Sequence, residues 1–434
     1  MAVKRNFSSS QLHATLVQMG KGPLSDVAIE LTGTKRFLGF DGLRAIAILL
    51  VVLWHSAIVI QFPQELMGPL RPIVMSGWMG VDLFFALSGF LITSLLLREE
   101  ARNEEVGLGQ RFSIGGFYLR RSLRILPVFL VVFLIQTFVL SGYLPSVNGD
   151  EILESGSAFG VWPYATFWGN YFVAWKSIWK NHLAVHAGLG YQAYWSLCVE
   201  EHFYLLWPVF LLLVKRSRLR IAIAVSACVL MCAARFVVRV EHLVPHQHIH
   251  TLSHYRMDSI LWGALGALVV THVPAVTAFR TSRLRRTLLA LLAAIALLLV
   301  ALGGLTVLPP PSAFGTSIGL SVLAMAATLL LVELISSPDS MFVRILELRP
   351  LTFIGRLSYA MYLIHFQAID LSGNIYAVEP SAPTISNLLG YFSLNVGISI
   401  AIAYVLHILV ERPFLLLKER LRVRRVLQKV AVVP

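Results

Sequence analysis

Two side chains suited to acid–base and anion-binding chemistry lie in one long apolar stretch near the N-terminus. His55 follows Arg44 by eleven residues. In a helix, eleven residues at about 100° each bring the second side chain to within about 20° of the first, with about 16 Å of rise between them. A neutral imidazole can act as a general base, and a guanidinium can bind an anion. A histidine here can also serve only as a hydrogen-bonding partner of a neighbouring helix, so both interpretations stay open.

Adjacent glutamates, Glu200 and Glu201, lie in a second apolar stretch at 194–214. Ser196 and Glu200 are four residues apart and share a helix face, whereas Glu201 points about 100° away. Carboxylates are costly inside a membrane, so two in succession indicate a functional site. We expect Glu200 to face that site.

Carboxylates also begin two other apolar stretches. Asp82 precedes Ser88 and Gly89, two small residues that we interpret as sites of close helix packing. Arg256 and Asp258 are two residues apart, and we interpret them as an ion pair at the end of their helix.

Two further motifs complete the set of candidate residues. Arg121 and Arg124 share a helix face, and paired guanidinium groups suit phosphate oxygens. The alternative roles for these arginines are a topology signal or binding of lipid head groups. Ser358, Tyr362 and His365 form one polar face of the stretch at 350–371.

The composition excludes a soluble globular protein. Of the 434 residues, 57% are hydrophobic and only 14% are charged, against roughly 25% charged in soluble domains. The net charge of +13 is scattered between apolar stretches and forms no single patch, so nucleic acid is not an expected partner. The three cysteines lie in apolar stretches, which indicates neither a disulfide framework nor a cysteine metal site.

The apolar stretches predict an all-α integral membrane protein, a bundle of about ten transmembrane helices. Stretches of about 20 apolar residues match the hydrocarbon thickness, and backbone groups in lipid must pair within helices. Segment 159–175 is aromatic but interrupted by Pro and Asn, so we interpret it as an interfacial or re-entrant part of a long loop, with an eleventh span as the alternative. The ten predicted spans are about 42–61, 78–97, 125–145, 194–214, 220–240, 257–274, 286–307, 314–335, 350–371 and 388–410.

The basic residues predict the orientation of the bundle. With the N-terminus in the cytoplasm, 28 of the 36 Lys and Arg residues fall in cytoplasmic tails and loops. That excess follows the positive-inside rule, so we predict a multi-pass protein of the cell (inner) membrane with both termini cytoplasmic. It would consist of a polar extension at 1–35, a membrane domain at 36–415 and a basic tail at 416–434.

Depth divides the candidates into two layers, a proton-handling layer above an anion-binding layer. The loop 242–254 contains five histidines, but it lacks Cys and a clear helical spacing, so zinc binding is the less favoured interpretation and no metal is expected. The outer layer holds His55, Asp82, Glu200, Glu201, Asp258 and His365, and the inner layer holds Arg44, Arg121, Arg124 and Arg356.

Seven short motifs, in order along residues 37–415, resemble those of the integral-membrane acyltransferase family 3, a family of O-acyltransferases similar to O-antigen acetylases. One departure is His202, where the family more often has Gln. The motifs are FDGLRAIAILLVVLWHS (40–56), GVDLFFALSGFLI (80–92), FYLRRSLRILP (117–127), YWSLCVEEHFYLLWP (194–208), RMDSILWGAL (256–265), FIGRLSYAMYLIHF (353–366) and ERPF (411–414).

The resemblance implies transfer of an acyl group, often acetyl, from cytoplasmic acyl-CoA to a hydroxyl of a surface polysaccharide, a lipid-linked sugar or another glycosylated acceptor. His55 would be the general base, with Glu200 or Asp82 orienting it or stabilising its charged form. Phosphates of coenzyme A would bind the inner arginines. The implied positions are Arg44, His55, Arg121, Arg124, Trp195, Ser196 and Glu200 from the motifs, with Glu201, Asp258, Tyr362 and His365 in supporting roles.

Two alternatives concern the kind of protein and its partners. Buried His, Asp and Glu residues also occur in proton relays, so a proton-coupled transporter or flippase of a lipid-linked or acylated substrate is the rival function. Many members of the family carry a fused extracytoplasmic hydrolase-like domain. Such a partner is expected here to be a separate protein.

Overall fold

The computed structural model describes residues 36–105, 107, 111–140, 162–179, 193–272, 315–376 and 384–431, and within these ranges every regular element is helical. The predicted extension 1–35 and the predicted span 286–307 lie outside them. The long helices are α3 (Phe40–Val59), α5 (Gly80–Glu105), α6 (Ile114–Leu134), α11 (Tyr194–Leu213), α12 (Ser217–Val240), α14 (Ser253–His272), α17 (Leu320–Ser336), α19 (Arg349–Ile375), α20 (Ile385–Leu406) and α21 (Arg412–Ala431). The shorter elements are η1 (Gln64–Leu70), α4 (Arg71–Met75), η2 (Gly77–Met79), η3 (Ile135–Leu140), α8 (Trp162–Ala165), α9 (Gly169–Trp179), α13 (His246–Thr251), η5 (Gly315–Gly319), α18 (Met341–Leu346) and η6 (His407–Glu411).

Seven stretches of the described chain are long and apolar enough to cross a membrane. The predicted fold class, an all-α membrane protein, is therefore confirmed, whereas the predicted count of about ten spans is not. α14 and α19 lie at two further predicted spans and have 20 and 27 residues. They are not among the seven because their polar side chains make them less apolar. The seven stretches are Phe40–Val59, Gln64–Glu105, Ile114–Phe138, Tyr194–Leu213, Ser217–Val240, Ser317–Ser336 and Ile385–Leu421.

The start of α6 differs from its prediction. The helix begins at Ile114, well before the predicted start at 125, because Ser113 caps it and accepts a hydrogen bond from the Gly116 N–H at 3.1 Å. Arg121 and Arg124, which precede the predicted start of the span, therefore lie in the same long helix as its apolar residues. Apolar periodicity alone misplaced this boundary, since the first turns of α6 carry several arginines.

Glycines bring the central helices into backbone contact. A Cβ on Gly89 of α5 would lie 1.9 Å from the Ile260 carbonyl oxygen of α14, and one on Gly355 of α19 would lie 1.8 Å from the Asp41 carbonyl oxygen of α3. Small residues permit such close approach between membrane helices. The predicted packing role of Gly89 is thus confirmed, and α5 with α14, and α3 with α19, are the most extensively packed helix pairs of the described chain.

Two buried ion pairs join helices on the α12 side of the bundle. Arg256 of α14 contacts Asp82 of α5 at 2.8 Å, and Arg235 of α12 contacts Asp258 of α14 at 2.6 Å. The prediction that Arg256 pairs with Asp258 is therefore wrong. Residues two apart on a helix point in different directions, so each finds its partner on a neighbouring helix.

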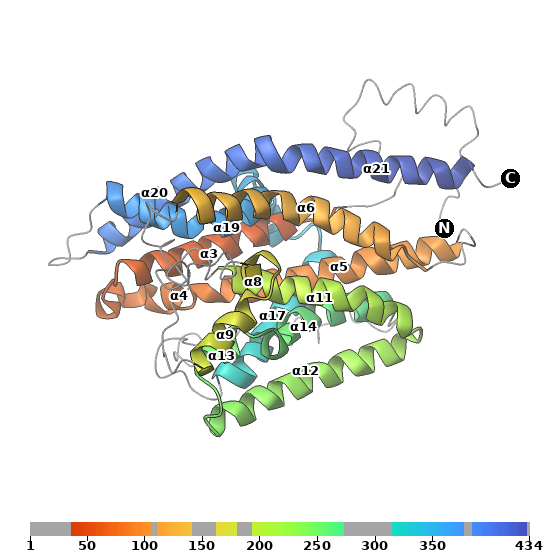
Figure 1. Cartoon of the computed structure of the whole chain (residues 1–434), viewed down its shortest axis with the longest axis horizontal. Helices are drawn as coiled ribbons and strands as arrows, with labels where there is room; N and C mark the ends of the chain where they lie inside the picture. The colour runs from red at the N-terminus through yellow and green to blue at the C-terminus, as the bar shows by residue number, and fades with distance from the viewer. Residues whose placement is uncertain are drawn as a thin grey trace.

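The C-terminal end of α5, the start of α6 and the turn from α11 to α12 lie at one end of the bundle, and α21 runs to the same end (Figure 1). We call this the basic end. There Glu100 bonds both Arg111 and Arg220, and Arg111 also donates to the Leu211 carbonyl oxygen at 2.8 Å. These bonds tie α5, α11 and α12 together. The predicted basic tail is largely helical, because α21 runs to Ala431.

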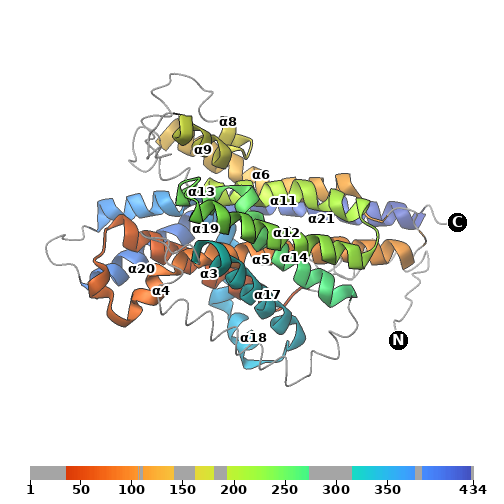
Figure 2. The same cartoon turned by 90° about the horizontal axis from the view of Figure 1, so that it is seen from below.

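The helices α8 and α9 project to one side of the long helices (Figure 2). They have 4 and 11 residues, too few to cross a bilayer, which needs about 20. For the described part of segment 159–175, the loop interpretation therefore fits better than an eleventh span.

Candidate active site

Two histidines from different helices lie side by side. His55 of α3 and His365 of α19 have ring centroids 4.8 Å apart. Nδ1 of His55 is 2.9 Å from the Val51 carbonyl oxygen, and Nδ1 of His365 is 2.6 Å from the Tyr362 carbonyl oxygen. A carbonyl oxygen only accepts hydrogen bonds, so each Nδ1 carries a proton and each Nε2 of a neutral ring offers a lone pair. Nε2 of His365 is buried and has no hydrogen-bond partner.

Tyr362 connects this pair to α11. Its hydroxyl lies 2.7 Å from Oγ of Ser196 and donates to the Ala193 carbonyl oxygen at 3.2 Å. The Tyr362 ring lies 5.4 Å from the ring of His365. The predicted supporting residues Ser196, Tyr362 and His365 therefore do come together, next to His55.

Glu200 is held one turn further along α11. It accepts a hydrogen bond from the Tyr204 hydroxyl at 2.6 Å, and Ser88 of α5 lies beside both groups. The guanidinium of Arg121 lies 4.7 Å above the Tyr204 ring, close enough to Glu200 and Glu201 for the charges to interact. A cation, two carboxylates and a phenol thus meet where α5, α6 and α11 approach one another.

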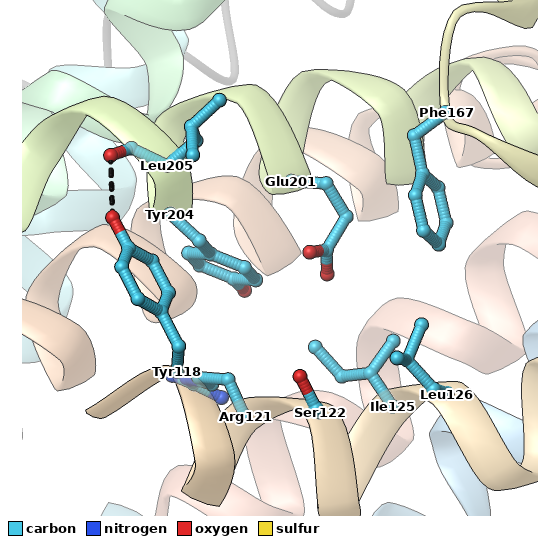
Figure 3. A pocket seen from close by; sticks show the side chains of 9 residues that line it. All are labelled: Tyr118, Arg121, Ser122, Ile125, Leu126, Phe167, Glu201, Tyr204 and Leu205. Atoms are coloured by element: carbon cyan, nitrogen blue, oxygen red, sulfur yellow. Dashed lines mark hydrogen bonds between the residues drawn. The ribbon is translucent and has the colours of Figure 1, made fainter. Parts of the chain in front are cut away.

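The two glutamates point into different surroundings, as their positions on the helix predict. Glu201 lines a cavity of about 210 Å³ between α6 and α11, and its carboxylate is directed into the open space (Figure 3). Oε1 of Glu201 is buried and has no hydrogen-bond partner. The cavity is lined by Tyr118, Arg121, Ser122, Ile125, Leu126, Phe167, Glu201, Tyr204 and Leu205.

The predicted anion-binding arginines converge from α3 and α6. Arg44 forms an ion pair with Asp41 at 2.9 Å. Arg121 and Arg124 are near enough to Arg44 for their like charges to act on it. The carboxylates of Asp41, Glu200 and Glu201 interact with these guanidinium groups, and a cluster of three guanidinium groups from two helices suits an anionic ligand.

Asp82 and Asp258 are engaged elsewhere in the structure. Oδ1 of Asp82 accepts hydrogen bonds from Arg256 at 2.8 Å and Ser259 at 2.9 Å. Trp195 belongs to the same group, because the Arg256 guanidinium lies 5.8 Å above its ring. Nδ1 of His55 bonds to the Val51 carbonyl oxygen, which orients the ring. The resemblance implied Glu200 or Asp82 for this orienting role. The assigned catalytic roles stay predictions.

Two histidines of the loop 242–254 contact different aromatic side chains. His250 contacts the Trp78 ring at 5.1 Å, and His254 lies 2.9 Å from the Tyr171 hydroxyl. Among the residues that the structure describes, no three His, Cys, Asp or Glu side chains are grouped so as to hold a metal ion.

The sequence patterns did not reveal the contacts that Tyr204, Ser88 and Tyr359 make in the site. Tyr204 follows Glu200 by four residues, a spacing that places the two on one helix face and that could have revealed it. The Tyr359 hydroxyl donates to the Ile125 carbonyl oxygen at 3.0 Å, a contact across 234 residues that no local pattern contains.

Comparison with known proteins gives one family and several relatives. A family model described as "Acyltransferase domain" matches residues 37–404. The chain is 31% identical to the "Putative peptidoglycan O-acetyltransferase YrhL" of Bacillus subtilis, over 77% of this chain and 49% of the relative. It is 27% identical to the "Peptidoglycan O-acetyltransferase OatA" of Listeria monocytogenes, over 80% of this chain and 51% of the relative.

A third relative extends the same pattern. The "O-acetyltransferase OatA" of Staphylococcus aureus is 26% identical, over 82% of this chain and 54% of the relative. The chain thus spans about half the length of the curated relatives that it matches. No solved structure matches it significantly.

Proposed function

Because this chain belongs to the family of membrane acyltransferase domains, acyltransferase family 3, we propose that it is an O-acyltransferase that moves an acyl group, acetyl in the simplest case, from acyl-CoA to a hydroxyl group. The observation that carries the proposal is the contact of His55 Nδ1 with the Val51 carbonyl oxygen, which leaves Nε2 as a proton acceptor beside His365. The family and the named relatives are acyltransferases, which favours this function over a transporter or flippase.

The proposed reaction is direct transfer. The acceptor oxygen attacks the thioester carbonyl carbon while Nε2 of His55 takes the hydroxyl proton. The carbon–sulfur bond then breaks, and the coenzyme A thiolate leaves and takes up the proton from the imidazolium. Val51 fixes the tautomer of His55, since its carbonyl binds the Nδ1 proton. Glu200 contributes negative charge that would stabilise the imidazolium.

The donor is proposed to bind from the basic end. Arg44, Arg121 and Arg124 supply guanidinium groups suited to the phosphates of coenzyme A. His55 lies about 16 Å further along α3 than Arg44, so donor phosphates and the reacting thioester would lie at different depths. With the basic end facing the cytoplasm, a cytoplasmic donor would acylate an acceptor on the outer side of the cell membrane.

The acceptor is proposed to be a glycan hydroxyl on the opposite side of the membrane. The names of two relatives specify peptidoglycan, which makes a cell-envelope glycan the first acceptor to test.

Reconstitution in vesicles tests the proposal. Protein oriented with its basic end outward receives radiolabelled acetyl-CoA outside, and soluble peptidoglycan fragments are enclosed. Covalent label on the enclosed glycan is the expected result, and it should require that the donor be added on the side of the basic end. Absence of acylated glycan with every donor and acceptor arrangement would contradict O-acyl transfer, and transfer only between reactants on one face would contradict the two-sided form.

A further inference from the structure

The cavity beside Glu201 is a slot that runs along the helices. Its residues on α6 extend from Tyr118 to Leu126, a distance of about 12 Å along a helix axis. The wall on α11 runs in the opposite direction, from Glu201 to Leu205. At the end of the slot that is nearer the basic end of the bundle, the Tyr118 hydroxyl donates to the Leu205 carbonyl oxygen at 2.8 Å (Figure 3).

The slot offers an unused hydrogen-bond acceptor between apolar walls. Oε1 of Glu201 is buried without a partner, and a buried polar atom left unpaired is destabilising. The Ser122 hydroxyl faces it from the opposite helix (Figure 3), while Ile125, Leu126 and Phe167 supply apolar surface. A ligand that fits must be narrow, must be mostly apolar along its length and must bring an N–H or O–H donor to the middle of the slot.

The two ends of the slot lie near different groups of the proposed site. Arg121 lies towards the basic end, where an anionic group would bind. Ile125 lies further along α6, and its carbonyl binds Tyr359 of α19 at 3.0 Å. Tyr362 follows one turn later on α19, beside His365 and hence His55. A ligand in the slot would therefore lead from a phosphate-binding end towards the histidine pair.

We propose that this slot holds the pantetheine arm of the acyl donor, and that Glu201 accepts a hydrogen bond from one of the two amide N–H groups of the arm. The inference rests on the proposed acyl-CoA-dependent function. The pantetheine arm is thin, has methylene groups between its amides and bears phosphate at one end and the thioester at the other. A lipid acyl chain would leave Glu201 unpaired, and a free phosphate would occupy only the Arg121 end.

Three acetyl donors that carry progressively less of coenzyme A separate the contribution of the phosphates from that of the amides. Acetyl-CoA has phosphates and both amides, acetyl-pantetheine has only the amides, and S-acetyl-mercaptoethanol has neither. Glu201→Leu should lower kcat/KM about tenfold or more for the first two donors and leave it within about twofold for the third, because only the first two bring an amide N–H. Arg121→Ala should act on acetyl-CoA more than on the other two.

Two further variants make the test specific. Glu201→Gln keeps an acceptor oxygen, so it should stay within about threefold of wild type for acetyl-pantetheine. Glu104→Leu removes an exposed carboxylate from α5 and should change none of the three ratios. Equal losses for all donors in Glu201→Leu, or no loss for any, would overturn the inference while leaving acyl transfer intact. If the wild type used no thioester at all, the proposed function itself would fail.

Discussion

Two buried regions of this bundle treat charge in opposite ways. On the α12 side, Arg235 meets Asp258 and Arg256 meets Asp82, with contacts of 2.6 and 2.8 Å between fully buried side chains. On the α6 side, Glu201 has an unpaired oxygen and Arg121 lies over an aromatic ring. Unpaired buried atoms occur on both sides, including Oδ2 of Asp82 and Nη1 of Arg256. Glu201 differs because its unpaired oxygen belongs to a residue that lines a cavity, where a ligand can reach it. We therefore interpret the Arg235–Asp258 and Arg256–Asp82 pairs as structural, and Glu201 and Arg121 as functional.

The largest expected effect is on the paired side. Asp258→Ala would leave Arg235 buried without its carboxylate, and breaking a buried pair in this way costs about 3–5 kcal/mol. The thermal unfolding midpoint in detergent should fall sharply, and the yield of folded protein should fall with it. The activity of the remaining folded fraction should stay close to wild type. A stable but inactive variant would place Asp258 in the chemistry and would contradict a purely structural role for the Arg235–Asp258 pair.

The next effect distinguishes the two glutamates. Glu200→Gln should lower kcat by about tenfold or more, since it removes the carboxylate charge that interacts with Arg121 and accepts the hydrogen bond of the Tyr204 hydroxyl. Glu201→Gln should have a smaller effect, because its amide oxygen still accepts a hydrogen bond. Steady-state kinetics on both purified variants would decide this. Equal losses, or the reverse order, would mean that the division of roles on α11 is wrong.

The smallest effect concerns the arginines. Replacing Arg121 and Arg124 together with Ala should raise the KM for acyl-CoA by about tenfold, because it removes binding present in ground and transition states alike. The KM for the acceptor should change little. The double variant of exposed Arg216 and Arg218, at the start of α12, is the matched control. An unchanged donor KM in the Arg121 and Arg124 variant would separate these arginines from the donor.

Helical periodicity correctly predicted features that lie within one helix. Ser196 and Glu200 share a face, and the separation of Glu200 from Glu201 follows from the 100° rotation per residue. The ring of His365 beside Tyr362 is also a same-helix feature. These predictions worked because a helix has one regular geometry, which the spacing of residues determines.

Contacts between helices were beyond the sequence. Asp82 lies on α5 and Arg256 on α14, separated by 174 residues, and spacing along a chain gives no information on which helices pack together. The same limit produced the wrong Arg256–Asp258 pair. The pairing of His55 with His365 across α3 and α19 likewise depends on the close approach that Gly355 permits.

The central claim is that His55 of α3, in the group it forms with side chains of α11 and α19, acts in catalysis and not only in helix packing. His55→Ala should reduce acetyl transfer by about 10²–10⁴-fold, the usual contribution of a general base, with an unchanged unfolding midpoint. His242→Ala, an exposed histidine outside this group, should change neither quantity. Transfer by His55→Ala within about threefold of wild type, measured with labelled acetyl-CoA on folded protein, would contradict the claim.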